Sequence, residues 1–354
     1  MILLLATAIM AFVVAVCMTP LIRKLASRLN VYAKPNHRTI HKQVVPLLGG
    51  ISIFAAYLFS FSLLIAFAPS SLDALIEESI VFIGAGFLIL LLGIYDDIKG
   101  ANSTQKLTTQ IIAATLVIIS GYKVSAVILP IGGIISLGIF SVPVTLLWIV
   151  GITNAINLID GLDGLAAGIS MGAALIMLAV SLYFGNIASA FPAAILASSL
   201  AAFLLFNFNP AKIFLGDSGS LFIGFMLGCF SINGTFRESS AVAMLIPMIV
   251  LGIPITDTIL AVIRRLRKGV HPFHADREHI HHRLLNLGLS HRKVVLLIYA
   301  ISLSWGLIAM LIFISSSPFM LVFLIPIAGT ILYGLRRLGF TQYFKLGHKP
   351  LEIQ

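Results

Sequence analysis

The chain has 354 residues, of which 59% are hydrophobic and 10% charged, and its mean hydropathy is +1.07. This composition excludes an ordinary soluble domain and is typical of a polytopic helical membrane protein. The net charge of +10 does not indicate nucleic acid as a partner, because Lys and Arg gather in short segments between apolar stretches. Cys17 and Cys229 lie in apolar stretches without CxxC spacing, so we expect buried thiols and no disulfide.

Eleven stretches are apolar enough to cross a bilayer, where a helix needs about 20 apolar residues. The first lacks a preceding basic region and a clear cleavage site, so we expect a retained helix and not a signal peptide. The predicted fold class is an all-α polytopic integral membrane protein, with residues 1–354 forming one domain. The predicted spans are 2–22, 44–68, 79–95, 107–122, 141–156, 165–184, 188–206, 219–234, 240–263, 293–314 and 318–335.

Segments rich in Lys and Arg predict the orientation. They follow the first span, fill the His- and Arg-containing loop 264–292, and recur in the tail after residue 335. With the N-terminus outside and the C-terminus cytoplasmic, all three face the cytoplasm. The apolar residues 124–140 are short and interrupted by proline and glycine, so we predict an outer β-hairpin there instead of a twelfth span. This topology places the acidic loops on the cytoplasmic side.

The most distinctive of these loops begins at Asn154. Asn154, Asn157, Asp160 and Asp163 follow one another at intervals of three, which predicts one face of a helix or helical turn. Two Asp-Gly pairs, at 160–161 and 163–164, add a signal for tight turns. This run alone leaves two interpretations open, a hydrated loop between two membrane helices or a ligand site.

Two other acidic elements carry the same ambiguity. The adjacent Asp96 and Asp97 follow the third span and form either a solvated loop or a carboxylate pair that serves as a base or gathers near a cation. Lys106 is either a topology charge or a phosphate contact. Asp217, in the sequence Phe-Leu-Gly-Asp-Ser-Gly, is either a helix N-cap or a ligand for the Mg²⁺ of a diphosphate.

The last element is a run of histidines in residues 271–283. His279, His281 and His282 do not match a usual closed zinc site, so recognition of an anionic diphosphate and its sugar is favoured over zinc. Asp257, near the end of the proline-containing ninth span, either faces the site or satisfies backbone groups or a neighbouring helix.

Together these elements favour a membrane enzyme that acts on a soluble diphosphate and a lipid. The sequence contains no P-loop motif. The alternative from another class is a transporter of a lipid-linked sugar or a cation, because acids within a membrane often mark ion paths. Transporter sites, however, tend to lie near the midplane in broken helices, whereas these acids lie at span ends on one side.

In their order along the chain, Asp96-Asp97, Asn-Ala-Ile-Asn-Leu-Ile-Asp-Gly-Leu-Asp-Gly, Phe-Leu-Gly-Asp-Ser-Gly and His-Ile-His-His resemble the motifs of the polyprenyl-phosphate N-acetylhexosamine-1-phosphate transferases. The resemblance extends over nearly the whole chain. It implies that UDP-N-acetylglucosamine and undecaprenyl phosphate give undecaprenyl-diphospho-N-acetylglucosamine and UMP, with Mg²⁺ or Mn²⁺. The reaction would occur on the cytoplasmic face of a bacterial inner membrane and begin teichoic acid, O-antigen or common-antigen synthesis.

The resemblance also implies roles for individual residues. Asp217 and Asn157 resemble the metal ligands, and Asp96 or Asp97 would act as the base or position the lipid phosphate. Asn154 is left with a structural hydrogen bond. The nucleotide would contact Lys42, Asn157, Asp160, Gly161, Leu162, Asp163, Asn207 and Phe214. The diphosphate and sugar would contact Lys106, Arg277, His279, His281 and His282.

We expect direct displacement, in which positioning and charge neutralisation supply most of the catalysis, with a covalent aspartyl-phosphate route as the alternative. The Ile between His279 and His281 is similar to the N-acetylhexosamine branch and argues against a muramoyl-pentapeptide substrate. The choice among N-acetylhexosamines, the downstream polymer and the formation of a homodimer stay open.

Overall fold

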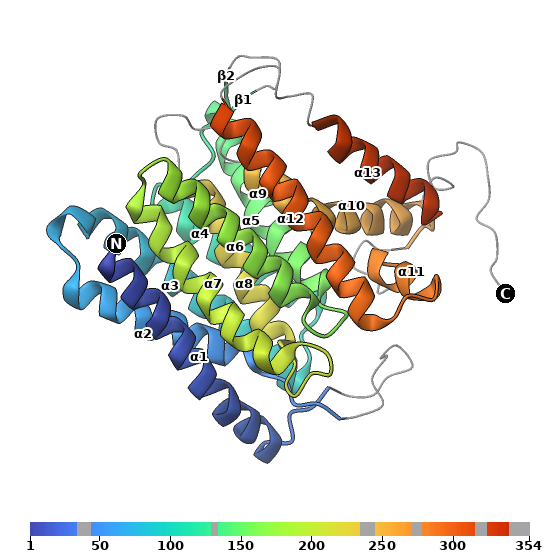
Figure 1. Cartoon of the computed structure of the whole chain (residues 1–354), viewed down its shortest axis with the longest axis horizontal. Coiled ribbons are helices and arrows are strands. Elements are labelled where there is room, and N and C mark those ends of the chain that lie inside the picture. The colour runs from blue at the N-terminus through green and yellow to red at the C-terminus, as the bar shows by residue number, and fades with distance from the viewer. Residues whose placement is uncertain (34–43, 129–133, 234–244, 271–277, 316–323, 340–354) are drawn as a thin grey trace.

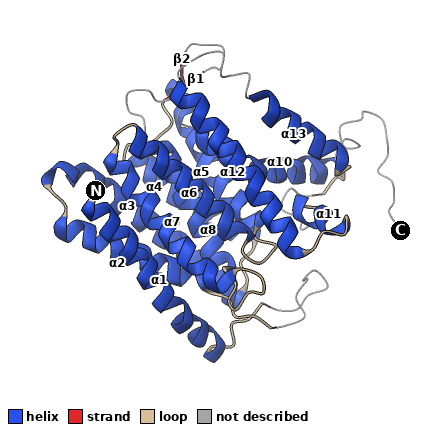
Figure 2. Ribbon diagram, viewed as in Figure 1, coloured by secondary structure: helices blue, strands red, loops and turns tan. Residues whose placement is uncertain are grey.

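The computed structural model describes residues 1–33, 44–128, 134–233, 245–270, 278–315 and 324–339, and helices dominate this part of the chain (Figure 2). Its α-helices are α1 (Ile2–Arg28), α2 (Gly49–Phe67), α3 (Asp73–Lys99), α4 (Ser103–Ile119), α5 (Ser141–Ile159), α6 (Leu165–Tyr183), α7 (Ile187–Asn207), α8 (Gly216–Asn233), α9 (Leu245–Val250), α10 (Gly252–Arg267), α11 (Ile280–Asn286), α12 (His291–Ser315) and α13 (Leu324–Arg337). Two strands, β1 (Ala126–Ile128) and β2 (Ile134–Ser136), pair antiparallel within the stretch predicted as a hairpin.

Seven helical stretches in the described part of the chain are long and apolar enough to cross a membrane. This confirms a mostly helical, polytopic membrane protein. The count of eleven spans stays a prediction, because α4 and α13 have only 17 and 14 residues. The orientation and the outer location of the strands stay predictions as well. The seven stretches are Ile2–Arg28, Gly49–Phe67, Ser79–Lys99, Gly138–Ile159, Leu165–Tyr183, Ser189–Asn207 and His291–Ile312.

The predicted ninth span, 240–263, is divided into α9 and α10. Pro254 lies in the first turn of α10, where its missing N–H costs no intrahelical hydrogen bond. The N–H of Leu251 donates to the carbonyl of Pro247 at 2.9 Å and thereby connects the two helices. The two helical segments meet at Leu251, and α10 carries Asp257, whose carboxylate contacts the start of α11.

Helix α8 lies at the centre of the bundle. Its residues Leu221, Phe222 and Phe225 are fully buried, and it packs against α2, α3 and α5. A Cβ atom at Gly50 of α2 or at Gly93 of α3 would overlap the backbone of α8 near Ser218. The absence of side chains at these two glycines lets the helices approach closely and fixes the start of α8.

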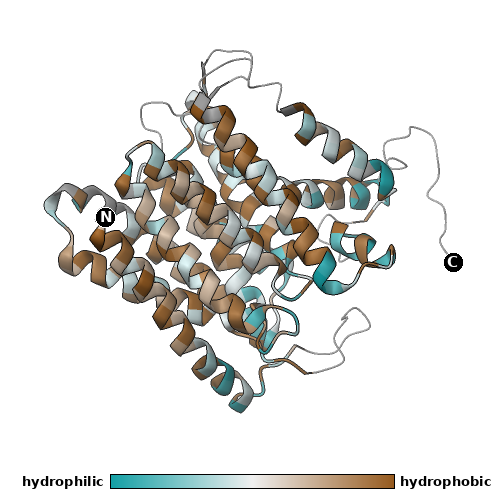
Figure 3. Cartoon of the chain, in the orientation of Figure 1, coloured by the Kyte–Doolittle hydropathy of each residue, from teal (hydrophilic) through white to brown (hydrophobic). Residues whose placement is uncertain are grey.

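The two ends of the bundle differ in character. The paired strands lie near the C-terminal end of α12, and α11 lies near its N-terminal end (Figure 1). Hydrophobic residues cover most of the long helices, whereas hydrophilic residues gather around α11 and the loops at the same end (Figure 3).

Candidate active site

A cavity of about 530 Å³ lies where α3 and α5 end and α8 begins. It brings together residues from every predicted motif, although these motifs are up to 186 positions apart in the sequence, from Asp96 to His282. The predicted residues that line it are Asp96, Asp97, Asp160, Gly161, Leu162, Asp163, Asn207, Phe214, Asp217 and His282. The convergence of these segments makes this cavity the candidate active site.

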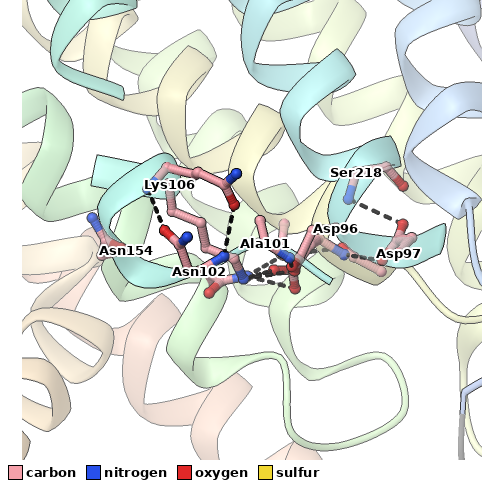
Figure 4. A network of polar contacts seen from close by, with 12 residues as sticks. Asp96, Asp97, Ala101, Asn102, Lys106, Asn154 and Ser218 are labelled. Carbon is pink, nitrogen blue, oxygen red and sulfur yellow. Dashed lines mark hydrogen bonds and ion pairs between the residues drawn. The ribbon is translucent and has the colours of Figure 1, made fainter. Parts of the chain in front are cut away.

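Asp97 caps the N-terminus of α8 from a neighbouring helix. Its carboxylate accepts hydrogen bonds from the backbone N–H groups of Asp217 at 2.8 Å and Ser218 at 3.2 Å (Figure 4). Gly216, with φ +71°, makes this approach possible, because a Cβ atom there would overlap the Asp97 carboxylate. The carboxylate that caps α8 is therefore that of Asp97 on α3, and not that of Asp217.

Lys106 joins the two acidic motifs. Its ammonium nitrogen lies 2.6 Å from Oδ2 of Asp96 and also donates to Oδ2 of Asp217. A capping box between Asn102 and Gln105 fixes the start of α4 and hence the position of Lys106 (Figure 4). The backbone N–H of Ala101 donates to the other oxygen of Asp96 at 2.5 Å. Lys106 therefore serves as a charge partner within the site and not as an isolated topology charge.

The two asparagines at the end of α5 have different partners. The amide nitrogen of Asn157 donates to Oδ1 of Asp217 and to the hydroxyl of Ser220, both at 2.9 Å. Asn154 instead donates to the side chain of Gln110 at 2.6 Å, which is the structural hydrogen bond expected of it. Both asparagines lie within α5, as the spacing of three predicts, whereas α5 ends at Ile159, before Asp160 and Asp163.

Asp160 lies directly after α5 and lines the cavity. Its backbone N–H donates to the carbonyl of Asn157 at 3.3 Å, whereas its carboxylate accepts no hydrogen bond from the described residues. Burial raises the pKa of its carboxyl well above the ordinary value, and the nearby carboxylates of Asp217 and Asp97 raise it further. A cation in the cavity would reverse this effect by stabilising the ionised form. The position therefore suits an ion that binds together with substrate.

The donor set fits Mg²⁺ bound partly by substrate. No three acidic, His or Cys side chains in the described part of the chain form a closed metal site. Mg²⁺ usually takes only one or two carboxylates from the protein and completes its shell with phosphate oxygens and water. The unpaired carboxylate of Asp160, next to Asp217, is consistent with such an open site.

Asp163 and Asn207 combine a place at the cavity with bonds that hold the loops. Oδ2 of Asp163 accepts from the amide of Asn209 at 2.9 Å and from the N–H of Ala211 at 3.0 Å. Asn207 accepts from the N–H of Gly164 at 3.1 Å and donates to the carbonyl of residue 213 at 3.0 Å. These bonds tie the Asp-Gly turns to the loop before α8. The predicted nucleotide contacts of both residues stay a prediction.

The three predicted histidines occupy different environments. His282 lines the cavity, whereas His281 is buried against Gly161, where a Cβ atom would overlap its ring. Burial and, to a smaller extent, the neighbouring His282 together lower the pKa of His281 to about 3, so the ring is neutral. His279 lies 2.7 Å from the carboxylate of Asp257. Of these histidines, His282 is the one that the structure places at the cavity.

The segment before α2 adds a residue that the sequence interpretation missed. Tyr32 lines the cavity, and strand-like backbone bonds join its neighbourhood to residues 45–47. The sequence feature that could have indicated Tyr32 is its place as a lone aromatic residue beside a basic segment. Two predicted contacts, Lys42 and Arg277, lie outside the described residues, and their roles stay predictions.

Comparison with known proteins gives a consistent result. The model of the family described as "Glycosyl transferase family 4" matches residues 79–235. The chain is 35% identical over 309 residues to the "Probable undecaprenyl-phosphate N-acetylglucosaminyl 1-phosphate transferase" of Bacillus subtilis (strain 168), covering 86% of this chain and 84% of that protein.

Two further relatives come from other bacteria. The chain is 37% identical over 306 residues to the "Decaprenyl-phosphate N-acetylglucosaminephosphotransferase" of Mycolicibacterium smegmatis, covering 78% of this chain and 74% of the relative. It is 27% identical over 282 residues to the "Undecaprenyl-phosphate alpha-N-acetylglucosaminyl 1-phosphate transferase" of Escherichia coli (strain K12), covering 78% and 75%. The matched family region contains Asp96, Asn157 and Asp217.

Proposed function

The chain belongs to glycosyl transferase family 4 and is a phosphoglycosyl transferase, and from this premise we propose that it transfers N-acetylglucosamine 1-phosphate from UDP-N-acetylglucosamine to undecaprenyl phosphate. The products are undecaprenyl-diphospho-N-acetylglucosamine and UMP. The observation that carries the proposal is the cavity in which aspartates from three separate segments converge with Lys106 close by. The relatives' names, which specify a polyprenyl phosphate and N-acetylglucosamine, supply the substrate class.

The nucleotide would occupy the part of the cavity lined by Gly161, Leu162 and Phe214. An aromatic ring provides a face on which uracil stacks. The missing side chain of Gly161 admits the His281 ring, which holds this turn next to the histidine motif. The backbone N–H of Phe214 donates to the carbonyl of Pro46 at 2.8 Å, so the main chain of this residue is held in place before substrate arrives. This arrangement supports selection of a uridine nucleotide.

The diphosphate would lie between these residues and the acidic cluster. Asp217 and Asn157 would hold Mg²⁺, with Asp160 beside them, and the metal would supply charge neutralisation on the diphosphate oxygens. Lys106 already contacts Asp217 and therefore lies within reach of the same phosphates. His282 lies on α11, lines the same cavity and would donate a hydrogen bond to the sugar phosphate.

The proposed reaction is a direct displacement. An oxygen of the polyprenyl phosphate forms a bond to the β-phosphorus, and the bond from that phosphorus to the bridging oxygen breaks, so UMP leaves with the electron pair. Both oxygens of Asp97 accept backbone hydrogen bonds, and both oxygens of Asp96 have donors. Such occupied carboxylates are better suited to positioning than to nucleophilic attack. This supports displacement over an aspartyl-phosphate intermediate.

The test is release of UMP by the purified full-length protein in lipid nanodiscs. We expect turnover only when UDP-N-acetylglucosamine, undecaprenyl phosphate and Mg²⁺ are all present, and UDP-glucose and UDP-N-acetylgalactosamine serve as matched donors. Preference for another UDP-N-acetylhexosamine would revise the sugar. Uptake of a solute without release of UMP would contradict the proposed reaction and favour a transporter.

The same proposal places the reaction on the cytoplasmic face of a bacterial inner membrane as the first membrane step of cell-envelope glycopolymer synthesis. UDP-sugars are cytoplasmic metabolites, and the basic segments predict that the acidic loops face that compartment. Cys229 is buried as predicted, but Cys17 is exposed and not buried, so the test uses a Cys17→Ser background. In that background a cysteine introduced at the exposed Lys99, which lines the cavity, should be labelled by an impermeant thiol reagent in inverted vesicles and protected in right-side-out vesicles. The reverse pattern would contradict this orientation.

A further inference from the structure

Asp257 is a buried acidic residue that the proposed reaction does not use. It lies on α10 with 1% of its surface exposed. A buried carboxylate is strongly unfavourable unless hydrogen bonds or charges compensate the lost hydration. The partners of Asp257 therefore indicate why the chain keeps a carboxylate there.

Both of its oxygens contact the start of the histidine motif. Oδ2 lies 2.7 Å from Nδ1 of His279, and Oδ1 accepts a hydrogen bond from the backbone N–H of Ile280 at 2.8 Å. His279 is the N-cap residue of α11, but its own side chain makes no capping bond. Asp257 thus supplies from a neighbouring helix the acceptor that α11 lacks, and it orients the His279 ring at the same time.

The orientation of His279 extends to the cavity through stacked rings. We use the term histidine stack for His279, His281 and His282. The first two rings are parallel with centroids 5.7 Å apart, whereas the second and third are tilted by 45° with centroids 4.3 Å apart. The middle ring also packs on Gly161 of the Asp-Gly turn. The first ring contacts Asp257, and the third lines the cavity.

We propose that Asp257 is a positioning residue that acts through the histidine stack and the first turn of α11 to present His282 to the substrate. This inference rests on the proposed function for its effect on turnover, whereas the anchoring contact itself is independent of the reaction. A carboxylate suits the role because one oxygen accepts from a backbone N–H while the other accepts from an imidazole N–H.

Two substitutions separate the contributions of Asp257. Asp257→Ala removes both acceptors. Asp257→Asn retains the size and one acceptor for Ile280, but its amide group donates to Nδ1 of His279 and thereby favours the other tautomer. Thr258→Val is the matched control, because among the described residues the Thr258 hydroxyl bonds the carbonyl of Pro254 within the same helix, at 2.9 Å, and no group of α11.

The first measurement is steady-state kinetics of the full-length protein in nanodiscs. We expect Asp257→Ala to raise KM for UDP-N-acetylglucosamine about tenfold, the lower end of the effect of losing the hydrogen-bond partner that orients a metal-bound histidine. Asp257→Asn should raise it less, and Thr258→Val should match the wild type. An unchanged KM in both Asp257 variants would overturn the proposal.

A double-mutant cycle with His282→Ala shows whether Asp257 acts through His282. If it does, Asp257→Ala adds little to the loss already caused by His282→Ala. Fully additive losses would overturn the proposal, because a merely structural role would reduce activity independently of His282. The same cycle with Asp257→Asn gives the answer should the alanine variant fail to fold.

Hydrogen exchange tests the anchor without reference to turnover. The amides of residues 280–282 should exchange faster in Asp257→Ala than in the wild type, and Thr258→Val should leave them protected. Equal protection in all three proteins would overturn the anchoring role. If the wild type releases no UMP from the proposed substrates, the proposed function fails, while this exchange experiment still decides the role of Asp257.

Discussion

The acidic side and the histidine side of the cavity are built in different ways. On the acidic side, Asp97 and Asp217 lie at the ends of long helices that pack together along the centre of the bundle. On the histidine side, His282 lies on α11, a helix of seven residues. Asp257 of α10 bonds the start of this short element, and Glu278 joins its Arg283 to Lys268 at the end of α10.

This difference indicates a division between a fixed and an adjustable part of the site. The acidic side takes its geometry from helix packing, so local changes there should disturb chemistry strongly. The histidine side takes its geometry from a few side-chain bonds, so changes there should act mainly on substrate binding. We therefore expect effects on kcat to dominate on the acidic side and effects on KM to dominate on the histidine side.

The strongest test of this comparison is Asp217→Asn. The substitution keeps the shape of the side chain but removes the charge that pairs with Lys106 and that would bind Mg²⁺. We expect kcat to fall on the order of 10³-fold, as for loss of a central group that stabilises transition-state charge. Asp73→Asn, at the opposite end of α3, is the matched control and should be neutral. Near-normal kcat at saturating Mg²⁺ would contradict the metal role.

Lys106→Met should have the next largest effect. It removes the ammonium between Asp96 and Asp217, so the two carboxylates repel each other and the diphosphate loses a charge partner. We expect a loss in kcat of about 10²-fold, with partial recovery in Lys106→Arg. The exposed Lys123→Met provides the control in the same assay of UMP release. A change confined to KM would show that the acidic side does not behave as the fixed part.

The sequence predicted which residues of this side lie at the cavity better than it predicted the bonds between them. Spacing and composition identified Asp96, Asp97 and Asp217, because charged residues are rare in so apolar a chain and therefore conspicuous. The cap that Asp97 provides to α8 was not predictable, since Asp97 and Asp217 lie 120 positions apart and only helix packing brings them together. The pattern indicated which acidic residues gather at the cavity but not which of them also hold the fold.

The histidine motif shows the same limit. His279, His281 and His282 form one short sequence pattern, yet one contacts Asp257, one packs on Gly161 and one lines the cavity. Their positions depend on the direction of α11, which in turn depends on a bond to a different helix. The helical structure itself was predictable from apolar length, because a lipid environment requires internal backbone hydrogen bonds.

Gly216→Ala tests how strictly the acidic side is fixed by packing. Its Cβ atom would overlap the Asp97 carboxylate and displace the cap of α8, and φ at this position is +71°. We expect about a tenfold loss in kcat and a loss of about 1–2 kcal/mol in stability, typical of a lost helix cap. Gly185→Ala is the control, because φ is +68° there but no atom lies within 4 Å of the new Cβ.

Both glycine variants place an alanine at a positive φ, but only Gly216→Ala brings a Cβ atom into overlap with the Asp97 carboxylate. Equal losses of stability and activity in both would mean that strain alone matters and that the contact between Asp97 and α8 is dispensable. A loss of activity specific to Gly216→Ala would show that the cap transmits packing to the reacting groups. Thermal unfolding in nanodiscs and release of UMP are measured on the same samples.

The smallest expected effect concerns Asp160, the acidic residue that packing does not satisfy. Its raised pKa means that the carboxyl keeps its proton at pH values where an ordinary aspartate is ionised. Mg²⁺ stabilises the ionised form, so its binding should release a proton, and the apparent affinity for Mg²⁺ should rise as pH increases toward the raised pKa. Isothermal titration of Mg²⁺ in the presence of UDP, in two buffers of different ionisation enthalpy, measures the released proton.

Asp160→Asn should remove this proton release and flatten the pH dependence of Mg²⁺ affinity. It should also raise the unfolding temperature of the metal-free protein slightly at neutral pH. The folded state binds the Asp160 proton more tightly than the unfolded state does, so the wild type loses stability as pH rises through the unfolded pKa toward the folded one, whereas the amide does not titrate. An unchanged proton count in Asp160→Asn would show that the ion binds elsewhere in the acidic cluster. Asp160 would then belong to the nucleotide pocket alone, and the acidic side would be fixed by packing throughout.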